Sequence, residues 1–423
     1  MNDKRIFDLA ADTFDGWVDS ETGLRVLKIA VRGQDISPRV DVDGCWRTWD
    51  HQFAPFLEGG RKLLVRGYPL RPNIDGCENG VNRPIHLIDL TTGEVTCPFP
   101  KGYHCWEVRD ATNLALLQSH SEGDADYLLW DLTAAAPLSK AEMPGWQPAW
   151  GSFLSDSRRA IVIYSRGEPL SGHCRSRLLL LEPDGSCTQI HEVDGHYCNH
   201  LQGCPTNPDL FSYQRWPSPL SAAGTDEVMH IRSVDGSFEQ RLPLVEGTVR
   251  PGPVPGGQRD HYLWMPDGKR VASYFLPNDE SSACYYEWEW WLSIMDWRTG
   301  ADLSLPYPPG RWGGHFQITP DGRHLIATGG REFSRLFVVE IDRLVDGWNE
   351  RVLAAYPPFD SSAKRINSTL NRHPHLLPDA SGVVLTGGYP GPQQGIYAVE
   401  WPEDLAACGD GGTGGGTGDA ATY

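Results

Sequence analysis

The hydrophobic and polar positions of this chain follow the pattern of short strands. Residues rich in Val, Ile, Leu, Tyr and Trp alternate with polar residues or form short apolar blocks, and Gly, Asp and Pro turns separate them. Helical periodicity is nearly absent, and only Asp342 to Ala355 favours a helical turn or two. The pattern therefore predicts an all-β protein.

One unit of this pattern recurs along the chain. It consists of an alternating strand, a turn resembling Pro-Asp-Gly, an apolar strand, a variable loop, another apolar strand and a turn resembling Asp-x-x-Thr-Gly. Each unit spans roughly 50–60 residues, near the longer propeller repeats. Repeated four-stranded units closed in a ring form a β-propeller, so the sequence predicts seven blades. The units begin at Gln52, Cys105, Pro148, His200, His261, His315 and His373.

The two ends of the chain lie outside these seven units. The strand at Leu24 to Ala30 has no blade of its own, and we expect it to pair beside Ile396–Glu400 and close the ring. Residues 1–405 are thus expected to form a single propeller domain. Residues 406–423 are rich in Gly, Thr and Asp, and we expect a disordered tail there, because such a segment buries little apolar surface.

Composition and charge narrow the class of partner. The formal net charge of −18 argues against nucleic acid, which needs a basic surface. No apolar run reaches the length of a membrane span, and the N-terminus lacks the apolar region of a secretory signal. The ten cysteines show no CxxC pairs and are typical of reduced thiols. We expect a cytoplasmic protein without nucleic-acid or membrane partners; the sequence does not indicate its oligomeric state.

Histidine occupies one position of the repeat four times in succession, five residues before the first residue of the predicted turn. The first strand of each propeller blade lines the central axis, so these side chains are expected to converge. His104 fits the same register in a weaker unit and is interpreted as structural. The four histidines of the series are His200, His261, His315 and His373.

A cluster of neutral imidazoles commonly holds a divalent ion, although a lone histidine in a strand is usually structural. His375 shares the strand face of His373, because residues two apart point to the same side. His200 lies among polar residues and is interpreted as a catalytic or substrate-binding group. The predicted metal ligands are therefore His261, His315, His373 and His375.

Polar and basic side chains suited to an acidic sugar lie near this histidine series. Arg215 ends a strand of the blade that carries His200, and an arginine binds a carboxylate with two hydrogen bonds. Walker, GxGxxG and GxSxG motifs are absent in their required contexts. The expected partner is an acidic oligosaccharide, and the further substrate-binding candidates are Asn199, Gln202, Trp216 and Arg372.

The chain resembles the oligogalacturonate lyases, which cleave short pectin fragments by β-elimination. The resemblance is carried by Asn199-His200-Leu201-Gln202, by Asp260 to Gly268 and by His373-Pro374-His375. It implies a seven-bladed propeller and a manganese ion held by the histidines matching His261, His373 and His375.

Two positions depart from the family pattern. The family's fourth ligand is a glutamine, and Leu370 stands at that position here; Asn371 or His315 is the candidate for the missing ligand. The family's base histidine is replaced by Gln214. Glutamine does not accept a proton at neutral pH, so the base is His200 or another group.

The sequence thus predicts a metal-dependent lyase for uronate-containing oligosaccharides, with His200 as base and Arg215 on the substrate carboxylate. Gln214, which stands at the family's base position, is included in the same set of predicted catalytic residues. Two alternatives remain. One is a non-catalytic carbohydrate-binding or interaction propeller. The other is a lyase for a glucuronate-type glycan, in which Gln214 to Trp216 change specificity.

Overall fold

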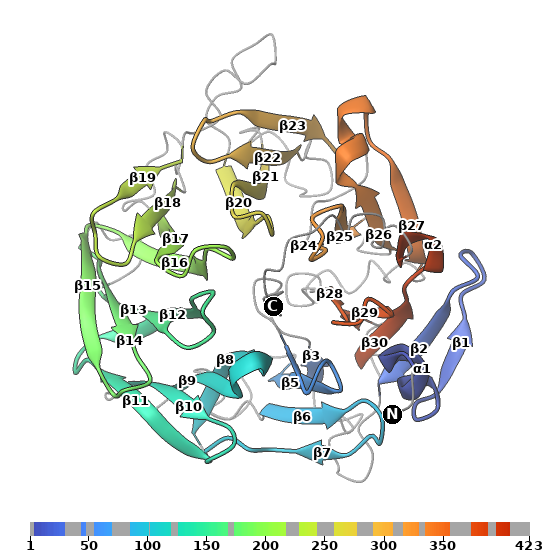
Figure 1. The fold of residues 1–423 in the computed structure, drawn as a ribbon, viewed down its shortest axis with the longest axis horizontal. Coiled ribbons are helices and arrows are strands. Elements are labelled where there is room, and N and C mark those ends of the chain that lie inside the picture. Colours follow the sequence, from blue (N-terminus) through green and yellow to red (C-terminus); the bar gives the residue numbers. More distant parts are fainter. Residues whose placement is uncertain are drawn as a thin grey trace, which may run out of the picture.

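The strands of the protein form seven antiparallel sheets arranged in a ring around one axis (Figure 1). The prediction of a seven-bladed β-propeller is confirmed. The computed structural model describes residues 4–29, 44–47, 55–69, 85–100, 102–119, 126–167, 173–216, 228–242, 258–276, 291–307, 316–329, 335–355, 374–387 and 395–406. Residues 407–423 lie outside these ranges, so the predicted domain boundary and tail stay predictions.

The second to sixth blades each contain four strands in an up-and-down order, with the first strand nearest the axis (Figure 1). Their bounds, blade by blade, are β8 (Tyr103–Arg109), β9 (Leu114–Ser119), β10 (Asp126–Asp131) and β11 (Ala136–Glu142); β12 (Gln147–Phe153), β13 (Ala160–Arg166), β14 (Arg175–Leu181) and β15 (Cys187–Asp194); β16 (Tyr197–Gly203), β17 (Leu210–Trp216), β18 (Val228–Ser233) and β19 (Glu239–Arg241); β20 (Gln258–Trp264), β21 (Arg270–Leu276), β22 (Trp291–Asp296) and β23 (Asp302–Pro306); β24 (Phe316–Ile318), β25 (His324–Gly329), β26 (Arg335–Glu340) and β27 (Glu350–Ala355).

The first and last blades are less regular. The first contains β3 (Gly44–Arg47), β4 (Phe56–Leu57), β5 (Lys62–Pro69), β6 (Ile85–Asp89) and β7 (Val95–Thr96). The last blade contains β28 (His375–Leu376), β29 (Gly382–Gly387) and β30 (Gly395–Glu400), followed outward by β2 (Arg25–Ile29) and β1 (Gly16–Val18).

The early strand predicted to join the last blade does pair with it. Strand β2 runs antiparallel to β30, with Ile29 opposite Ile396. The guanidinium of Arg25 donates to both carboxylate oxygens of Glu400, from Nε to Oε2 at 3.0 Å and from Nη2 to Oε1 at 2.6 Å. Asp8 of the short helix α1 (Ile6–Ala11) binds the same guanidinium at 2.7 Å. These contacts tie the N-terminal segment to the last blade, and closure of the ring by β2 stays a prediction.

Helical structure is sparse, as the periodicity predicts. The region expected to hold a helical turn contains a 3-10 helix at Ile341–Asp346 and, after a short connection, strand β27. Helix α1 and the four-residue helix α2 (Glu403–Ala406) were not expected from the sequence. Among the described residues, no helix has the length and apolar character needed to cross a membrane.

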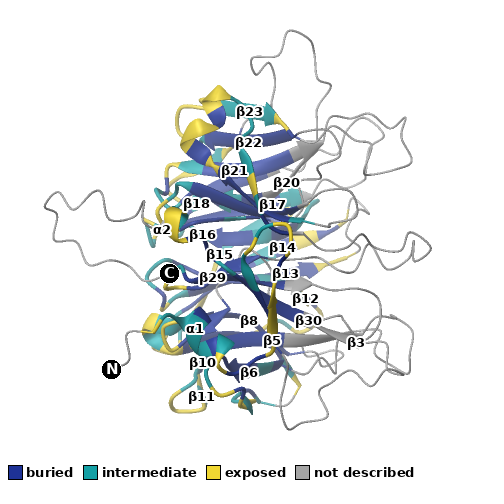
Figure 2. Cartoon of the chain, turned by 90° about the vertical axis from the view of Figure 1, so that its right-hand side faces the viewer, coloured by how far each residue is buried: buried dark blue, intermediate teal, exposed yellow. Residues whose placement is uncertain are grey.

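The core lies between neighbouring blades, where apolar side chains from two adjacent sheets interdigitate. Met265 and Tyr274 of the fifth blade, for example, pack with Phe316 and Phe337 of the sixth. Figure 2 shows the described strands buried along most of their length and exposed mainly at the turns. Because apolar packing covers both faces of the blades, polar residues on the inner strands are candidates for the functional site.

Side chains of the inner strands also bind the backbone of the next blade. The Phe153 amide of β12 donates to Glu107 Oε2 of β8 at 2.9 Å. Gln202 Nε2 of β16 donates to the backbone carbonyl of Tyr262 in β20 at 2.5 Å. The Leu376 amide of β28 donates to Gln317 Oε1 of β24 at 2.6 Å. These contacts hold successive inner strands in register around the axis.

Candidate functional site

The inner strands of four successive blades each carry a break in ladder register near the same place in the repeat. In β8, for example, Cys105 pairs with Leu117 and Glu107 with Leu116, so Trp106 lies opposite no single partner. A bulge of this kind leaves one residue outside the ladder and re-aims its neighbours, and such bulges are frequent beside active sites. The other three bulges lie between Pro148 and Trp150, between Asn199 and Gln202, and between Asp260 and Leu263.

A left-handed residue in the following turn fixes which positions of the repeat are equivalent. Gly268 has φ +62° and lies seven residues after His261. Asn113, with φ +53°, and Ser157, with φ +57°, hold the same place in the second and third blades. Counting back seven residues, the position of His261 is taken by tryptophan in both of these blades.

This register identifies two residues that the sequence pattern missed. Trp106 of β8 and Trp150 of β12 are the equivalents of His200 and His261, and His104 lies two residues out of register. The left-handed turn residue was hidden because Asn113 and Ser157 stand where the fifth and sixth blades have Gly268 and Gly322, although asparagine is among the residues that adopt this conformation most readily. Aligning the turns on their left-handed residue rather than on proline would have found the pair.

His200 has a backbone conformation that is rare for a residue with a side chain. Its φ is +45°, within the bulge of β16, and its ring is half-buried. A left-handed non-glycine residue costs on the order of 1 kcal/mol or more, and such strain clusters at functional sites. The imidazole lies beside the indole of Trp150, with ring centroids 5.0 Å apart.

The amide oxygen of Gln214 faces the imidazole of His200. Gln214 lies on β17, is fully buried, and places Oε1 within hydrogen-bonding distance of His200 Nδ1. Because an amide oxygen can only accept, this contact puts a proton on Nδ1 and leaves the lone pair on Nε2. The structure thus brings together two of the predicted catalytic residues, in an arrangement that can accept a proton from a substrate.

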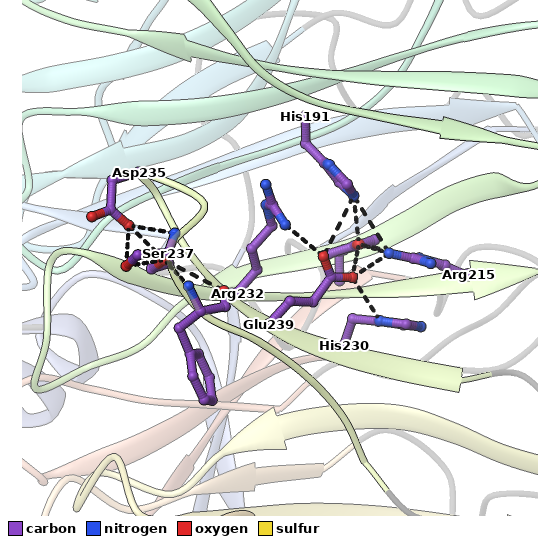
Figure 3. Close-up of polar contacts among 10 residues, drawn as sticks. His191, Arg215, His230, Arg232, Asp235, Ser237 and Glu239 are labelled. Carbon is purple, nitrogen blue, oxygen red and sulfur yellow. Dashed lines mark hydrogen bonds and ion pairs between the residues drawn. The ribbon is translucent and has the colours of Figure 1, made fainter.

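Arg215 lies on the opposite face of the same blade. Successive residues of a strand point to opposite sides, so the side chains of Gln214 and Arg215 diverge. Arg215 forms an ion pair with Glu239 and donates to the hydroxyl of Tyr213 at 2.5 Å (Figure 3). The structure therefore does not bring Arg215 to His200, and it gives this arginine a protein carboxylate in place of the predicted substrate carboxylate.

Glu239 is the centre of a polar cluster at the outer strands of the third and fourth blades (Figure 3). Its Oε2 accepts from Arg232 Nη1 at 2.5 Å, and its Oε1 lies 3.0 Å from His230 Nδ1. Tyr213 donates to Oε1 at 3.1 Å. Burial alone would raise the pKa of Glu239, but Arg215 and the other partners hold it below its ordinary value. The cluster stabilises the outer edge of the fourth blade, away from the axis.

Two histidines of this cluster make the fold sensitive to acid. Burial, reinforced by nearby arginines, lowers the pKa of both His191 and His230 to about 4. In the unfolded chain these groups take up protons near their ordinary pKa of 6.5, whereas in the folded protein they stay neutral until about pH 4. The free energy of unfolding should thus fall as pH drops from 6.5 towards 4, by at most about 3 kcal/mol for each histidine.

We expect the variant His191→Gln/His230→Gln to lose much of this acid sensitivity. The comparison is the slope of the urea midpoint between about pH 7 and pH 4.5 in the wild-type and variant proteins, because the slope is independent of the contacts that the substitutions themselves remove. An equally steep fall in both proteins would assign the acid sensitivity to other groups.

The remaining substrate-binding candidates divide into three kinds. Gln202 of the fourth blade is buried, and its amide is held by two backbone groups of the fifth blade, the carbonyl of Tyr262 and the N–H of Trp264. Asn199, next to His200, is 5% exposed, and its Oδ1 accepts no hydrogen bond from the described residues. The side chain of Trp216 is not described, and Arg372 lies outside the described residues.

The predicted metal site falls largely outside the described part of the chain. His375 is fully buried on β28 and meets Phe56 edge-on, with ring centroids 6.5 Å apart. The backbone of His261 lies in β20, but its side chain is not described, and His315 and His373 lie outside the described residues. Within the described ranges no group of three or more His, Cys, Asp or Glu side chains could hold a metal ion. The metal assignment therefore stays a prediction.

Known structures share this fold over nearly the whole chain. An oligogalacturonate lyase in complex with manganese matches at TM-score 0.66 and 18% identity, covering 93% of this chain and 97% of that chain. An oligogalacturonate lyase from Vibrio parahaemolyticus matches at TM-score 0.66 and 16% identity, with the same coverage. The likeness is one of fold. Hydrazine synthase from Kuenenia stuttgartiensis matches at TM-score 0.53 and 11% identity, covering 87% of this chain and 98% of that chain.

Comparisons at the level of sequence find no counterpart. No protein-family model matches the chain, and no curated protein matches it. The resemblance seen in the sequence motifs is thus supported as a structural resemblance, and the activity has to be argued from the residues of this chain.

Proposed function

We propose that this protein is a lyase that cleaves uronate-containing oligosaccharides by β-elimination, with His200 as the general base. The observation that carries this proposal is the His200–Gln214 pair at the bulge of an inner strand. It occurs in a propeller whose fold matches two oligogalacturonate lyases over 93% of the chain.

The reaction needs a base placed beside the C5 hydrogen of a uronate. The C5–H bond breaks, its electron pair forms the C4=C5 double bond, and the C4–O bond breaks as the leaving sugar takes a proton from solvent. His200 Nε2 is suited to take the C5 proton because the contact between Nδ1 and Gln214 leaves Nε2 unprotonated. Gln214 does not touch the substrate in this scheme and acts as a positioning residue.

The predicted ion would be held by His261, His315, His373 and His375, of which the described side chains include only His375. A divalent ion supplies Lewis-acid stabilisation of the charge that develops on a uronate carboxylate. Imidazole donors suit several transition metals, and manganese is named for a solved lyase of the same fold.

A non-catalytic carbohydrate-binding propeller is the second candidate. It is favoured by the ion pair between Arg215 and Glu239, which occupies the arginine expected to hold a substrate carboxylate. In such a protein the His200–Gln214 pair would bind sugar hydroxyls and perform no proton transfer. Binding of an oligosaccharide without turnover would support this candidate.

Incubation of the manganese-loaded protein with saturated oligogalacturonates is expected to give a product with a 4,5-unsaturated end, followed by its ultraviolet absorbance. A parallel incubation with glucuronate-containing oligosaccharides tests the alternative uronate. Elemental analysis of the same sample establishes that the protein carries metal, and heat-denatured protein is the control. Absence of product from every uronate, with metal present, would contradict the lyase.

A further inference from the structure

Three aromatic rings lie side by side on consecutive inner strands. The indole of Trp106 on β8 is 5.0 Å from the indole of Trp150 on β12, with an interplanar angle of 42°. The imidazole of His200 on β16 follows at 5.0 Å from Trp150, with an angle of 59°. The three strands are the inner strands of the second, third and fourth blades (Figure 1). The row ends at the proposed base.

Both tryptophans differ from most other described tryptophans in their exposure. Trp106 and Trp150 are half-buried, and each packs against two of the apolar clusters between blades. Six other described tryptophans are buried, namely Trp130, Trp146, Trp264, Trp291, Trp297 and Trp401, whereas Trp348 is partly buried against the core of the sixth blade. Part of each indole is exposed, in the row that ends at His200, and is accessible to a ligand.

The two rings are also held in place. Trp106 Nε1 donates to Gln118 Oε1 at 2.5 Å, which fixes the orientation of the indole. The backbone carbonyl of Trp150 accepts from the hydroxyl of Tyr127 at 3.0 Å, which fixes the bulged strand beneath it. A rigid aromatic surface loses little side-chain entropy when a ligand covers it, because its rotamers are already fixed.

A pyranose ring fits such a surface. It presents a face of C–H groups, which packs against an indole, and an edge of hydroxyls, which needs polar partners such as His200 and the Oδ1 of Asn199. A nucleic-acid base also stacks on tryptophan, but the net charge of −18 disfavours a polyphosphate.

We propose that Trp106 and Trp150 form a stacking platform for the sugar residues that extend from the cleaved bond towards the second blade. For the identity of the sugar, this platform rests on the lyase function proposed above. Of the predicted metal ligands within the described residues, the backbone of His261 lies in β20 of the fifth blade and His375 lies in β28 of the last blade, so both come after the blade of His200 in the order of the ring. In this arrangement the sugar residues on the platform side extend from His200 along β12 and β8.

Trp106→Ala and Trp150→Ala are each expected to weaken binding of a saturated oligogalacturonate by about tenfold, the order of one good aromatic contact. Calorimetric titration in the His200→Ala background measures the dissociation constant without turnover. Trp17→Ala is the matched control, because Trp17 is 49% exposed on β1 at the outer edge of the last blade. Trp150→Phe retains an aromatic face and should restore most of the affinity, which separates stacking from loss of folding.

With His200 present, both alanine variants should raise KM for longer oligosaccharides about tenfold, and Trp106→Ala, at the end of the row away from His200, should change KM far more than kcat. Unchanged affinity and KM in folded Trp106→Ala and Trp150→Ala proteins would overturn the platform while leaving the lyase intact. Tryptophan-dependent binding without any unsaturated product would support the platform and contradict the lyase. Failure of the His200→Ala and wild-type proteins to bind any uronate oligosaccharide would overturn the platform.

Discussion

Replacing His200 with alanine is expected to lower kcat of the lyase reaction by about 10³-fold, the usual contribution of a positioned general base. The physical reason is that Nε2 of this imidazole is the proposed acceptor for the C5 proton. KM should change little, because the platform and the predicted metal ligands remain. Steady-state formation of the 4,5-unsaturated product measures both constants. Wild-type activity in the His200→Ala protein would show that another group is the base.

Gln214 provides the matched control for this assignment. Gln214→Leu removes the acceptor that holds the proton on Nδ1, and kcat should fall by about 10–100-fold, as when a positioning partner is lost. Gln214→Glu keeps an acceptor and adds a negative charge, which favours the protonated imidazole and raises its pKa. The acid limb of the pH–rate profile should then move to higher pH. A merely structural glutamine would leave that limb in place.

Replacing Glu239 with glutamine is expected to lower the free energy of unfolding by about 3 kcal/mol. Glu239 is the shared carboxylate of Arg215 and Arg232, whose side chains are 22% and 13% exposed. Glutamine keeps the shape but leaves both guanidinium groups largely buried without a counter-charge, which costs more than the ion pairs themselves contribute. Urea unfolding measured at two wavelengths gives the change and tests whether the transition remains two-state.

The exposed ion pair between Lys4 and Asp12 is the comparison for Glu239. Its side chains are 52% and 64% exposed, so Asp12→Asn should change the free energy of unfolding by less than about 1 kcal/mol. Because Arg215 serves the cluster, folded Glu239→Gln protein should retain the wild-type KM. A loss of stability no larger than that of Asp12→Asn would contradict the structural role of the cluster.

Local pattern alone was enough to predict the architecture. The alternation of apolar and polar residues identifies strands, and the recurrence of one unit fixes seven blades, because each blade buries both faces and thus repeats the same constraint. The pairing of Arg25–Ile29 with Gly395–Glu400 also followed from the sequence, since the early strand had no unit of its own. The same periodicity predicted that His200 lies on the inner strand of its blade, which is β16 beside the central axis of the propeller.

The partners of the site residues followed from the tertiary structure alone. Arg215 and Gln214 are neighbours in sequence, but the strand sends one to Glu239 and the other to His200. The sequence predicted that Gln202 binds substrate. In the structure its side chain instead bonds the backbone carbonyl of Tyr262 in β20, a buried group that needs a hydrogen-bond partner.

The sequence by itself determined that the chain is a ring of seven blades and that His200 and His261 lie on inner strands, because both depend on periodic burial, which is specified locally along each strand. Only the tertiary structure decided that Trp106 and Trp150 share the position of His200 and lie beside it. That outcome depends on the breaks in strand register and on left-handed turn residues such as Asn113 and Ser157, whose backbone conformation does not follow from residue type alone.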